Sequence, residues 1–418
     1  MPLDVSGAVE AAYRSHWGRI VATLIRLVSD FDVAEECTQE AFTAALDQWG
    51  ASGIPDSPLA WLMQTARHKA IDHIRRQERY SEKLESYVTS GLFRTIETPD
   101  YNTDDIPDER LRLMFTCCHP ALALEAQVTL TLHTLCGFQA DEIARAFLVP
   151  PTTMAQRLVR AKRKIRVARI PYIVPDLKDM SARLASVLTV AYLVFNEGYA
   201  ATRGDALVRI DFCAEAIRIA RLIRNLMQPQ PPREVTGLLA LMLLHDARRD
   251  ARHDAAGDLV LLESQHRELW NRLQIDEGLS LVEHAMNGAP GPFALQAAVA
   301  AVHCRADRAE NTDWREILQL YDVLEGVQPS PIVSLNRAVA VAMVEGATEA
   351  LKAIEPLVEG QDLENFHLLH STRADLLRRI GDSFGAASSY RRALALVKND
   401  AERRYLERRL EEVQRSMP

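Results

Sequence analysis

Apolar side chains recur every three or four residues along most of the chain, the spacing that places them on one face of an α-helix. Two such amphipathic segments lie between Cys136 and Arg169, separated by the sequence Leu148-Val149-Pro150-Pro151. Proline fits a turn or the first turn of a helix but not a helix interior. The stretch therefore predicts a helix-turn-helix. The positions expected to face its core are Ile143, Ala144, Phe147, Met154, Leu158, Ala161 and Ile165.

The opposite face of the second helix carries hydrogen-bonding and cationic side chains. Arginine and glutamine can pair with guanine and adenine edges in a major groove. No acidic residue occurs between Glu142 and Asp176, although the whole chain has a net charge of −8. A charge run also fits a plain solvated helix face, so the segment alone leaves both interpretations open. The outward positions are Thr152, Thr153, Gln156, Arg157 and Arg160, followed by Lys162, Arg163, Lys164, Arg166 and Arg169.

The N-terminal part of the chain predicts three more helices. Apolar spacing indicates one over Val9 to Val28 and another over Leu59 to Arg79. Between them, Asp32 precedes Glu35 by three residues, a capping-box pattern that would open a helix with an acidic, polar face. The third helix combines Trp61 with several cations, a combination that suits stacking and steering of single-stranded bases. The alternative is that Trp61 only seals the edge of the core.

Tyr80 to Pro107 loses this periodicity and collects Ser, Thr, Pro and Asp, which indicates a flexible linker. Helices are expected again over Asp108 to Cys118 and Glu125 to Cys136. These helices would complete a small bundle around the helix-turn-helix. Pro171 and Pro175 then end that domain.

The C-terminal half predicts helix after helix, and past Pro290 a repeat. Its units are offset by 33 and then 36 residues, close to the helix-pair period of tetratricopeptide repeats. Stacked helix pairs form a concave surface suited to a peptide or another domain, or they only pack on their neighbours. The matching positions are Ile317, Tyr321 and Leu324; Ala350, Ile354 and Leu357; and Ala386, Tyr390 and Ala393. Upstream, helices are expected over residues 180–196, 206–227, 233–248, 259–273 and 277–286.

Length and composition restrict the function. A chain of 418 residues has room for two or three domains. Its negative net charge argues against indiscriminate coating of nucleic acid, so any DNA contact should be local. The start has no signal-peptide pattern and the most apolar stretch, Val235 to Leu244, is too short to span a bilayer, so we expect a cytoplasmic protein.

No motif indicates catalytic chemistry. The chain has no Gly-rich phosphate loop and no nucleophile elbow. The cluster Cys117-Cys118-His119 lacks the two-residue gap of zinc sites. We therefore predict no enzyme activity, no catalytic residue, no metal and no cofactor.

Three segments together resemble a known family. They read DVAEECTQEAFTAALDQW, PLAWLMQTARHKAIDHIRR and GFQADEIARAFLVPPTTMAQRLVRAKRKIR. Their order and spacing over about the first 170 residues are similar to the two domains of extracytoplasmic-function sigma factors, group IV of the sigma-70 family. In that family the first domain binds the clamp helices of RNA polymerase and melts the minus-10 promoter element. The second domain reads the minus-35 element.

The resemblance implies roles for individual positions. Core RNA polymerase would be bound by Asp32, Glu35, Glu36, Gln39, Glu40 and Asp47. The minus-10 strand would be contacted by Trp61, Thr65, Arg67, His68, Lys69, Asp72, Arg75 and Arg76. Minus-35 bases would be read by Thr152, Thr153, Gln156, Arg157 and Arg160, with Lys162, Arg163 and Lys164 on phosphates. Leu148 and Thr152 depart from the family, which often has Gly at both places.

We therefore expect an all-α chain with sigma domains at residues 1–79 and 108–170, a linker at 80–107, a helical connecting domain at 176–289 and tetratricopeptide-like repeats at 290–418. This order resembles a subgroup with such a C-terminal extension that is not thought to need a membrane anti-sigma partner. The expected function is transcription initiation with core RNA polymerase and promoter DNA as partners. The C-terminal region would regulate the sigma domains or recruit a soluble protein partner. The alternative is a helix-turn-helix regulator with a repeat sensor domain that acts without polymerase.

Overall fold

The computed structural model describes residues 5–85, 108–147, 149–199, 210–254, 257–360 and 362–417. In these ranges helices and their connections make up the chain, and no strand is formed, which confirms the all-α prediction. The chain divides into two compact units, Met1–Val190 and Ala191–Pro418. Most of the expected linker, residues 86–107, and Leu148 in the expected turn lie outside the described residues.

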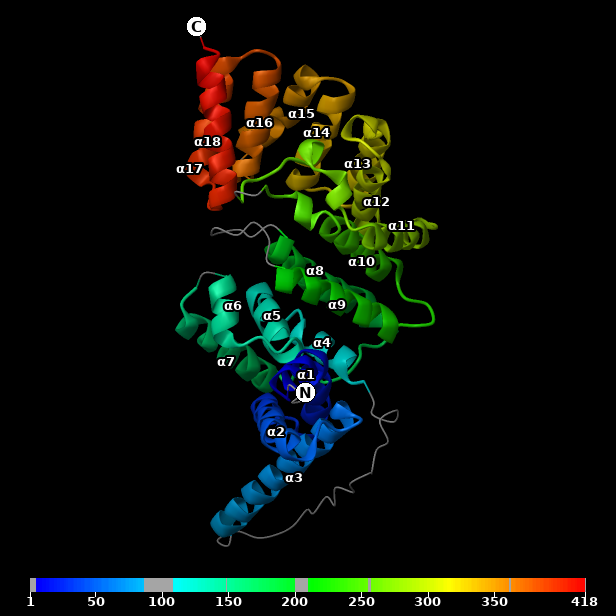
Figure 1. Cartoon of the computed structure of the whole chain (residues 1–418), viewed down its shortest axis with the longest axis vertical. Helices are drawn as coiled ribbons and strands as arrows, with labels where there is room; N and C mark the ends of the chain where they lie inside the picture. Colours follow the sequence, from blue (N-terminus) through cyan, green and yellow to red (C-terminus); the bar gives the residue numbers. More distant parts are fainter. Residues whose placement is uncertain are drawn as a thin grey trace. The chain divides into compact units, whose positions relative to one another are not determined.

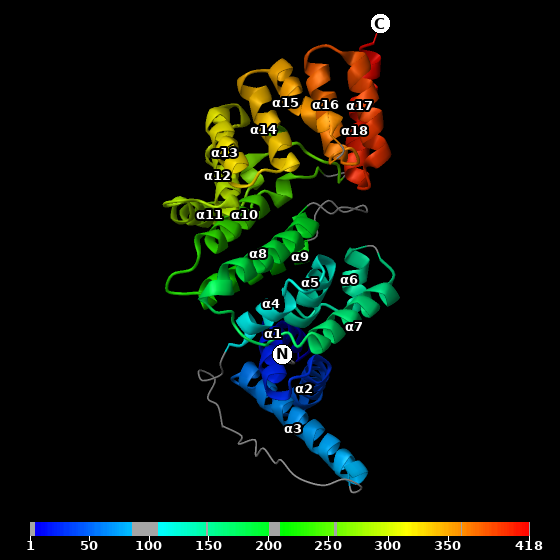
Figure 2. The ribbon, with the colours of Figure 1, turned by 180° about the vertical axis from the view of Figure 1, so that it is seen from behind.

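Three helices begin unit 1, α1 (Val5–Val28), α2 (Phe31–Ser52) and α3 (Pro58–Glu85), and α3 runs out past the other two (Figures 1 and 2). Trp17 and Trp49 anchor their core, each only 1% exposed. Asp30, not Asp32, caps α2, because its extended backbone lets its carboxylate accept the amide N–H of Asp32 at 2.9 Å. The linker was predicted to begin at residue 80, but α3 continues to Glu85, because the residues after Arg79 favour a helix.

The second part of unit 1 is the predicted bundle with its helix-turn-helix. Its elements are α4 (Arg110–Cys117), α5 (Leu124–Leu130), a π-helical turn (Thr131–Leu135), α6 (Ala140–Ala146) and α7 (Pro151–Val167). Pro150 caps α7 and Pro151 is its first residue, as the sequence predicted. The apolar face of α7 is also confirmed, because Met154, Leu158, Ala161 and Ile165 are buried.

Helix α10 (Arg233–Asp246) forms the centre of the first part of unit 2. The helices of this part are α8 (Leu177–Tyr199), in which the boundary between the units falls, α9 (Ile210–Leu226), α10, α11 (Arg272–Met286) and α12 (Pro292–Arg305). Every residue from Val235 to Leu244 in α10 is buried, and α10 contacts α9, α11 and α12. The most apolar stretch of the sequence is thus a core helix surrounded by other helices.

The expected helix over residues 259–273 is wrong. Trp270 is 3% exposed, and the guanidinium groups of Arg248 and Arg267 lie over its ring at 5.7 and 4.4 Å from the centroid. Its extended backbone cannot continue a helix, and Asn271 then caps α11. The cation–π contacts of Trp270 and the cap at Asn271 therefore determine the backbone conformation here, although the apolar spacing favours a helix. Before them the described chain has an isolated β-bridge between His253 and Leu259 and the short 3-10 turns Leu262–Ser264 and Arg267–Leu269.

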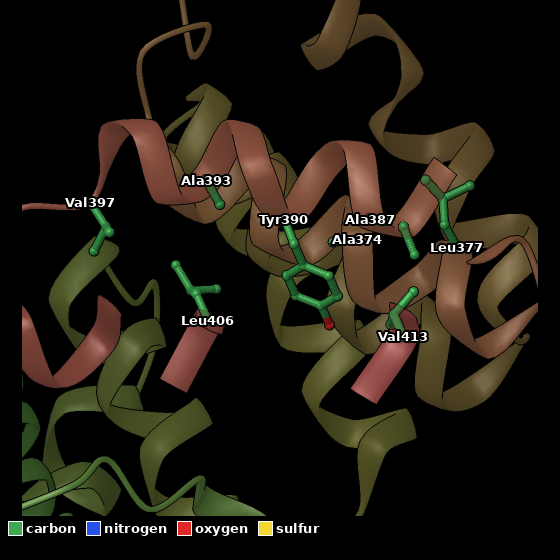
Figure 3. Packing of buried hydrophobic residues seen from close by; sticks show 9 residues of the cluster. Ala374, Leu377, Ala387, Tyr390, Ala393, Val397, Leu406 and Val413 are labelled. Atoms are coloured by element: carbon green, nitrogen blue, oxygen red, sulfur yellow. The ribbon is translucent and has the colours of Figure 1, made fainter. Parts of the chain in front are cut away.

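The last six helices lie in a row, each against the next in sequence (Figure 2). They are α13 (Trp314–Val327), α14 (Pro331–Val344), α15 (Ala347–Glu359), α16 (His367–Arg379), α17 (Ser383–Leu396) and α18 (Asp400–Arg415). Matching positions of the sequence repeat are buried in α13, α15 and α17, among them Ile317, Ile354 and Tyr390. In Figure 3 the Tyr390 ring of α17 extends toward α18, with Leu406 and Val413 of that helix on either side of it. Each helix thus buries its apolar face on its neighbours.

Candidate functional site

The acidic face of α2 is the first candidate surface. Asp32, Glu36, Gln39, Glu40 and Asp47 are exposed along it. Lys69 of α3 pairs with Glu40 at 3.3 Å, and both side chains are more than 40% exposed, so this pair contributes little stability. The face is available to a cationic partner along most of its length. Glu35 is the exception, with 6% exposed.

The second candidate surface runs along α3. Trp61 is half-buried and meets Trp49 edge to face, with ring centroids 5.6 Å apart. Trp61 thus packs against the core and remains partly accessible, so its sealing role is observed and its stacking on bases stays a prediction. The other predicted positions lie on this helix, with Thr65 and Arg67 half-buried and His68, Lys69, Asp72, Arg75 and Arg76 exposed.

The third candidate surface is the outer face of α7. Thr152, Gln156, Arg160, Arg163 and Lys164 are exposed, and Thr153 and Arg157 are half-buried. Because the opposite stripe of the helix is buried, these side chains point away from the bundle. Lys162 is the exception, since its side chain is only 11% exposed.

Lys162 reaches α2 instead. Its ammonium group donates to a Glu35 carboxylate oxygen at 2.7 Å and to Asp32 at 2.9 Å. One turn further along α7, Arg166 donates to Asp30 at 2.9 Å. The structure thus joins part of the acidic face of α2 to part of the cationic face of α7.

Glu35 is held by the π-helical turn as well. His133 lies 3.1 Å from one Glu35 carboxylate oxygen, and the Thr134 hydroxyl donates to the other at 3.0 Å. A π-helical turn shifts the direction of the side chains that it carries, and such turns are frequent at functional sites. Burial raises the pKa of Glu35, but the hydrogen bonds and charges of His133 and Lys162 outweigh it and bring that pKa below its ordinary value. Glu35 is therefore a buried carboxylate.

Backbone contacts extend this junction. The indole N–H of Trp17 donates to the Thr134 carbonyl at 3.1 Å, and the Tyr13 hydroxyl donates to the Gly137 carbonyl at 2.9 Å. Burial raises the pKa of Tyr13 to about 12, so its hydroxyl remains a donor at neutral pH. Gly18 packs so closely that a Cβ there would overlap the Leu135 carbonyl oxygen. Sequence reasoning missed this junction, because contacts more than 90 residues apart leave no local periodic signal.

Known protein families match the helices that carry these three surfaces. The family models described as Sigma-70 region 2 and Sigma-70, region 4 match residues 12–80 and 112–165. Residues 183–286 match a model described as a family of unknown function, DUF6596. No solved structure matches the chain.

Curated relatives fall into two groups. The uncharacterized protein R00370 of Rhizobium meliloti is 43% identical over 409 residues, 97% of this chain and 96% of that protein. The probable ECF RNA polymerase sigma factor SigI of Mycobacterium tuberculosis is 29% identical over 39% of this chain and 56% of its own length. The ECF RNA polymerase sigma factor SigK of Mycobacterium sp. is 29% identical over 26% of this chain and 55% of its own length.

Region 2 followed by region 4 in one chain defines the class, a sigma factor of the sigma-70 family with a role in transcription initiation. The sigma-70 matches and the SigI and SigK relatives support an extracytoplasmic-function sigma factor, and the chain belongs to the same full-length family as R00370. Sigma factors are non-enzymatic initiation factors. Below, region 2 denotes α1 to α3, and region 4 denotes α4 to α7 with the π-helical turn. Within the described ranges, every helix is too short or too polar to cross a lipid bilayer.

Proposed function

We propose that the chain binds core RNA polymerase through the acidic face of α2 and directs it to promoters through α3 and α7. The observation that supports this most directly is the outer face of α7, where groups able to read base edges are exposed beside cations suited to phosphates. In this proposal Thr152, Thr153, Gln156, Arg157 and Arg160 read minus-35 bases, and Lys162, Arg163 and Lys164 bind phosphates.

In the same proposal, α3 binds the minus-10 element. A base that leaves the stack must be captured by an aromatic face, and cations alongside must follow the strand. Trp61 supplies the ring, while Arg75 and Arg76 lie exposed further along the same helix. A regulator that binds only duplex DNA has no use for such a face, so α3 favours the sigma function over that alternative.

For the C-terminal helices we propose a regulatory or partner-binding role. Residues of α14, α16 and α18, together with the segment from Leu259 to Arg267, line a cavity of about 520 Å³. Exposed Met343 and Leu368 give it an apolar wall, and Asp375 pairs there with Arg378 at 2.7 Å. An apolar cavity of this size with a few oriented charged groups suits a segment of a soluble protein. We assign the tetratricopeptide-like repeats at residues 290–418 to this role and residues 176–289 to the connecting domain.

The test is run-off transcription with purified core RNA polymerase on a genomic promoter library. We expect the full-length chain to initiate from a subset of promoters, and Arg157→Ala to weaken minus-35 recognition by about 1–3 kcal/mol at one base position. Lys164→Ala should instead weaken all promoters to a similar degree and reduce the salt dependence. Binding of duplex DNA by the chain alone, with no initiation on any template, would support the regulator instead.

A further inference from the structure

Regions 2 and 4 share five charged side chains that join α2 to α7, here called the docking cluster. Its buried part is the Lys162–Glu35 pair, 11% and 8% exposed, and its outer part joins Arg166 to Asp30 and Asp32. Exposed ion pairs contribute little, so the buried pair dominates. Removing one partner of a buried pair leaves the other charge without compensation, which strongly disfavours the arrangement. The cluster therefore depends on both regions remaining in contact.

The backbone fit at Gly18 makes the same contact independent of charge. A methyl group on this α1 residue has no room against the Leu135 carbonyl of the π-helical turn. Gly137, with φ of 82°, approaches Tyr13 and Trp17 from the region 4 side. Polar and steric complementarity therefore coincide at one interface between the two regions.

This docked arrangement cannot serve a promoter. The minus-10 and minus-35 elements are about 25 base pairs apart, which corresponds to roughly 85 Å of duplex at about 3.4 Å per step. With α7 joined to α2 by ion pairs of 2.7 and 2.9 Å, and α3 only about 42 Å long at 1.5 Å per residue, the docked unit falls well short of that length. Region 2 and region 4 must separate before α3 and α7 can occupy both elements.

We propose that region 4 docks on region 2 in the free protein, and that this interface excludes polymerase and promoter until it opens. The inference rests on the proposed function, which assigns Asp32 and Glu35 to polymerase and Lys162 to phosphate. In the docked state these groups bind one another. Polymerase and DNA then compete with an intramolecular partner, and the affinity for polymerase falls in proportion to the undocked fraction.

The first test measures the distance between α2 and α7 in the full chain. Spin labels at Leu46→Cys and Val159→Cys suit it, because these side chains are 49% and 66% exposed. Cys136→Ser removes the one cysteine that is not buried. We expect one short distance in the free protein and a longer one after core polymerase is added.

Gly18→Ala tests the interface without changing a charge. It should raise the fraction with the long distance at least tenfold in the free protein and strengthen polymerase binding by a similar factor. Alanine also favours helix α1, so the expected undocking is not a loss of that helix. The matched control is Gly50→Ala in α2, where nothing lies within 4 Å, and it should leave the distance unchanged.

A charge test uses Lys162→Gln with Arg166→Gln, compared with Arg163→Gln, whose side chain is exposed on the same helix. Only the first variant should lengthen the distance. A long distance in the free wild-type chain, or equal distances in Gly18→Ala and Gly50→Ala, would overturn docking. A short distance that persists in the polymerase complex would overturn its exclusive character. Docking without any transcript would count against the proposed function alone, and transcripts without docking against this inference alone.

Discussion

Glu35 is next to Glu36 in sequence and one turn before Gln39, both of them exposed, yet its environment differs from theirs. Its carboxylate accepts hydrogen bonds from Thr134 and Lys162, while its neighbours face solvent. Sequence position therefore decides which face a side chain occupies, and tertiary contacts decide whether it can meet a partner. Trp61 shows the converse, because core packing against Trp49 orients a ring that remains accessible.

Unit 1 should lose stability in acid through Glu35. Its pKa in the folded protein is below the ordinary value of 4.5, so its contribution is present above that value and is lost as pH falls through the lowered pKa. Glu35→Gln should cost about 3 kcal/mol of unfolding free energy at pH 7, and less as the pH falls below about 4.5. The measurement is urea unfolding of both proteins between pH 3 and 7. A pH-independent difference would contradict this. The charged and titratable groups that interact with Glu35 are Lys162, His133, Tyr13 and Cys117, and Asp32 shares Lys162 with it.

Under the proposed function, Trp61→Ala should slow promoter melting by an amount equivalent to about 1–3 kcal/mol, because a stacking face for one base is lost. Trp61→Phe keeps a ring and should retain most of the rate. The measurement is the rate of open-complex formation on duplex and on pre-melted templates. If Trp61 only stabilises the fold through Trp49, both templates will be affected equally.

Among the elements, amphipathic helices could be predicted from sequence because their apolar positions repeat at a fixed spacing. The turn before α7 was predictable from Pro150 and Pro151, and the outer face of α7 followed from its buried stripe. The segment before α11 was mispredicted, because Trp270 is held by arginines whose contacts the pattern does not encode. The partners of Lys162 could not be predicted for the same reason, since α2 lies 127 residues away.

A helix cap offers a test in the C-terminal row. The Asp382 carboxylate accepts the amide N–H of Gly385 at 2.8 Å at the start of α17. Asp382→Ala should therefore lower the unfolding free energy of this region by about 1 kcal/mol, whereas Asp382→Asn keeps an acceptor and should cost less than half of that. Chemical denaturation of the full chain measures both. Equal losses in the two variants would show that charge, and not capping, matters here.

At the scale of the whole molecule, the chain combines a sigma unit with a longer helical unit. The boundary falls within α8, whose first half belongs with unit 1. Arg183 of that half donates to the Phe115 carbonyl at 2.5 Å. The structural end of the sigma unit is therefore later than Pro175, where the proline pattern had placed it.

Two truncations test this boundary. A chain ending at Val190 should keep the thermal midpoint of unit 1, while one ending at Pro175 should melt roughly 5 °C lower, because it loses the charged hydrogen bond of Arg183. Calorimetry of both fragments, with Arg183→Ala in the longer one as a control, measures the difference. Identical midpoints would place the end of the unit at Pro175.

Asp258 accepts hydrogen bonds from Arg404 and Arg408 of α18, the former across 146 residues of sequence. A row of helices that touch only their neighbours would open first at its free end, and the amides of α18 would exchange with solvent fastest. These two arginines instead tie the last helix to the segment before α11. Amide exchange in α18 should therefore be as slow as in α17, and Asp258→Asn should make α18 exchange first. A single carboxylate would thus make the end of the row open together with its middle.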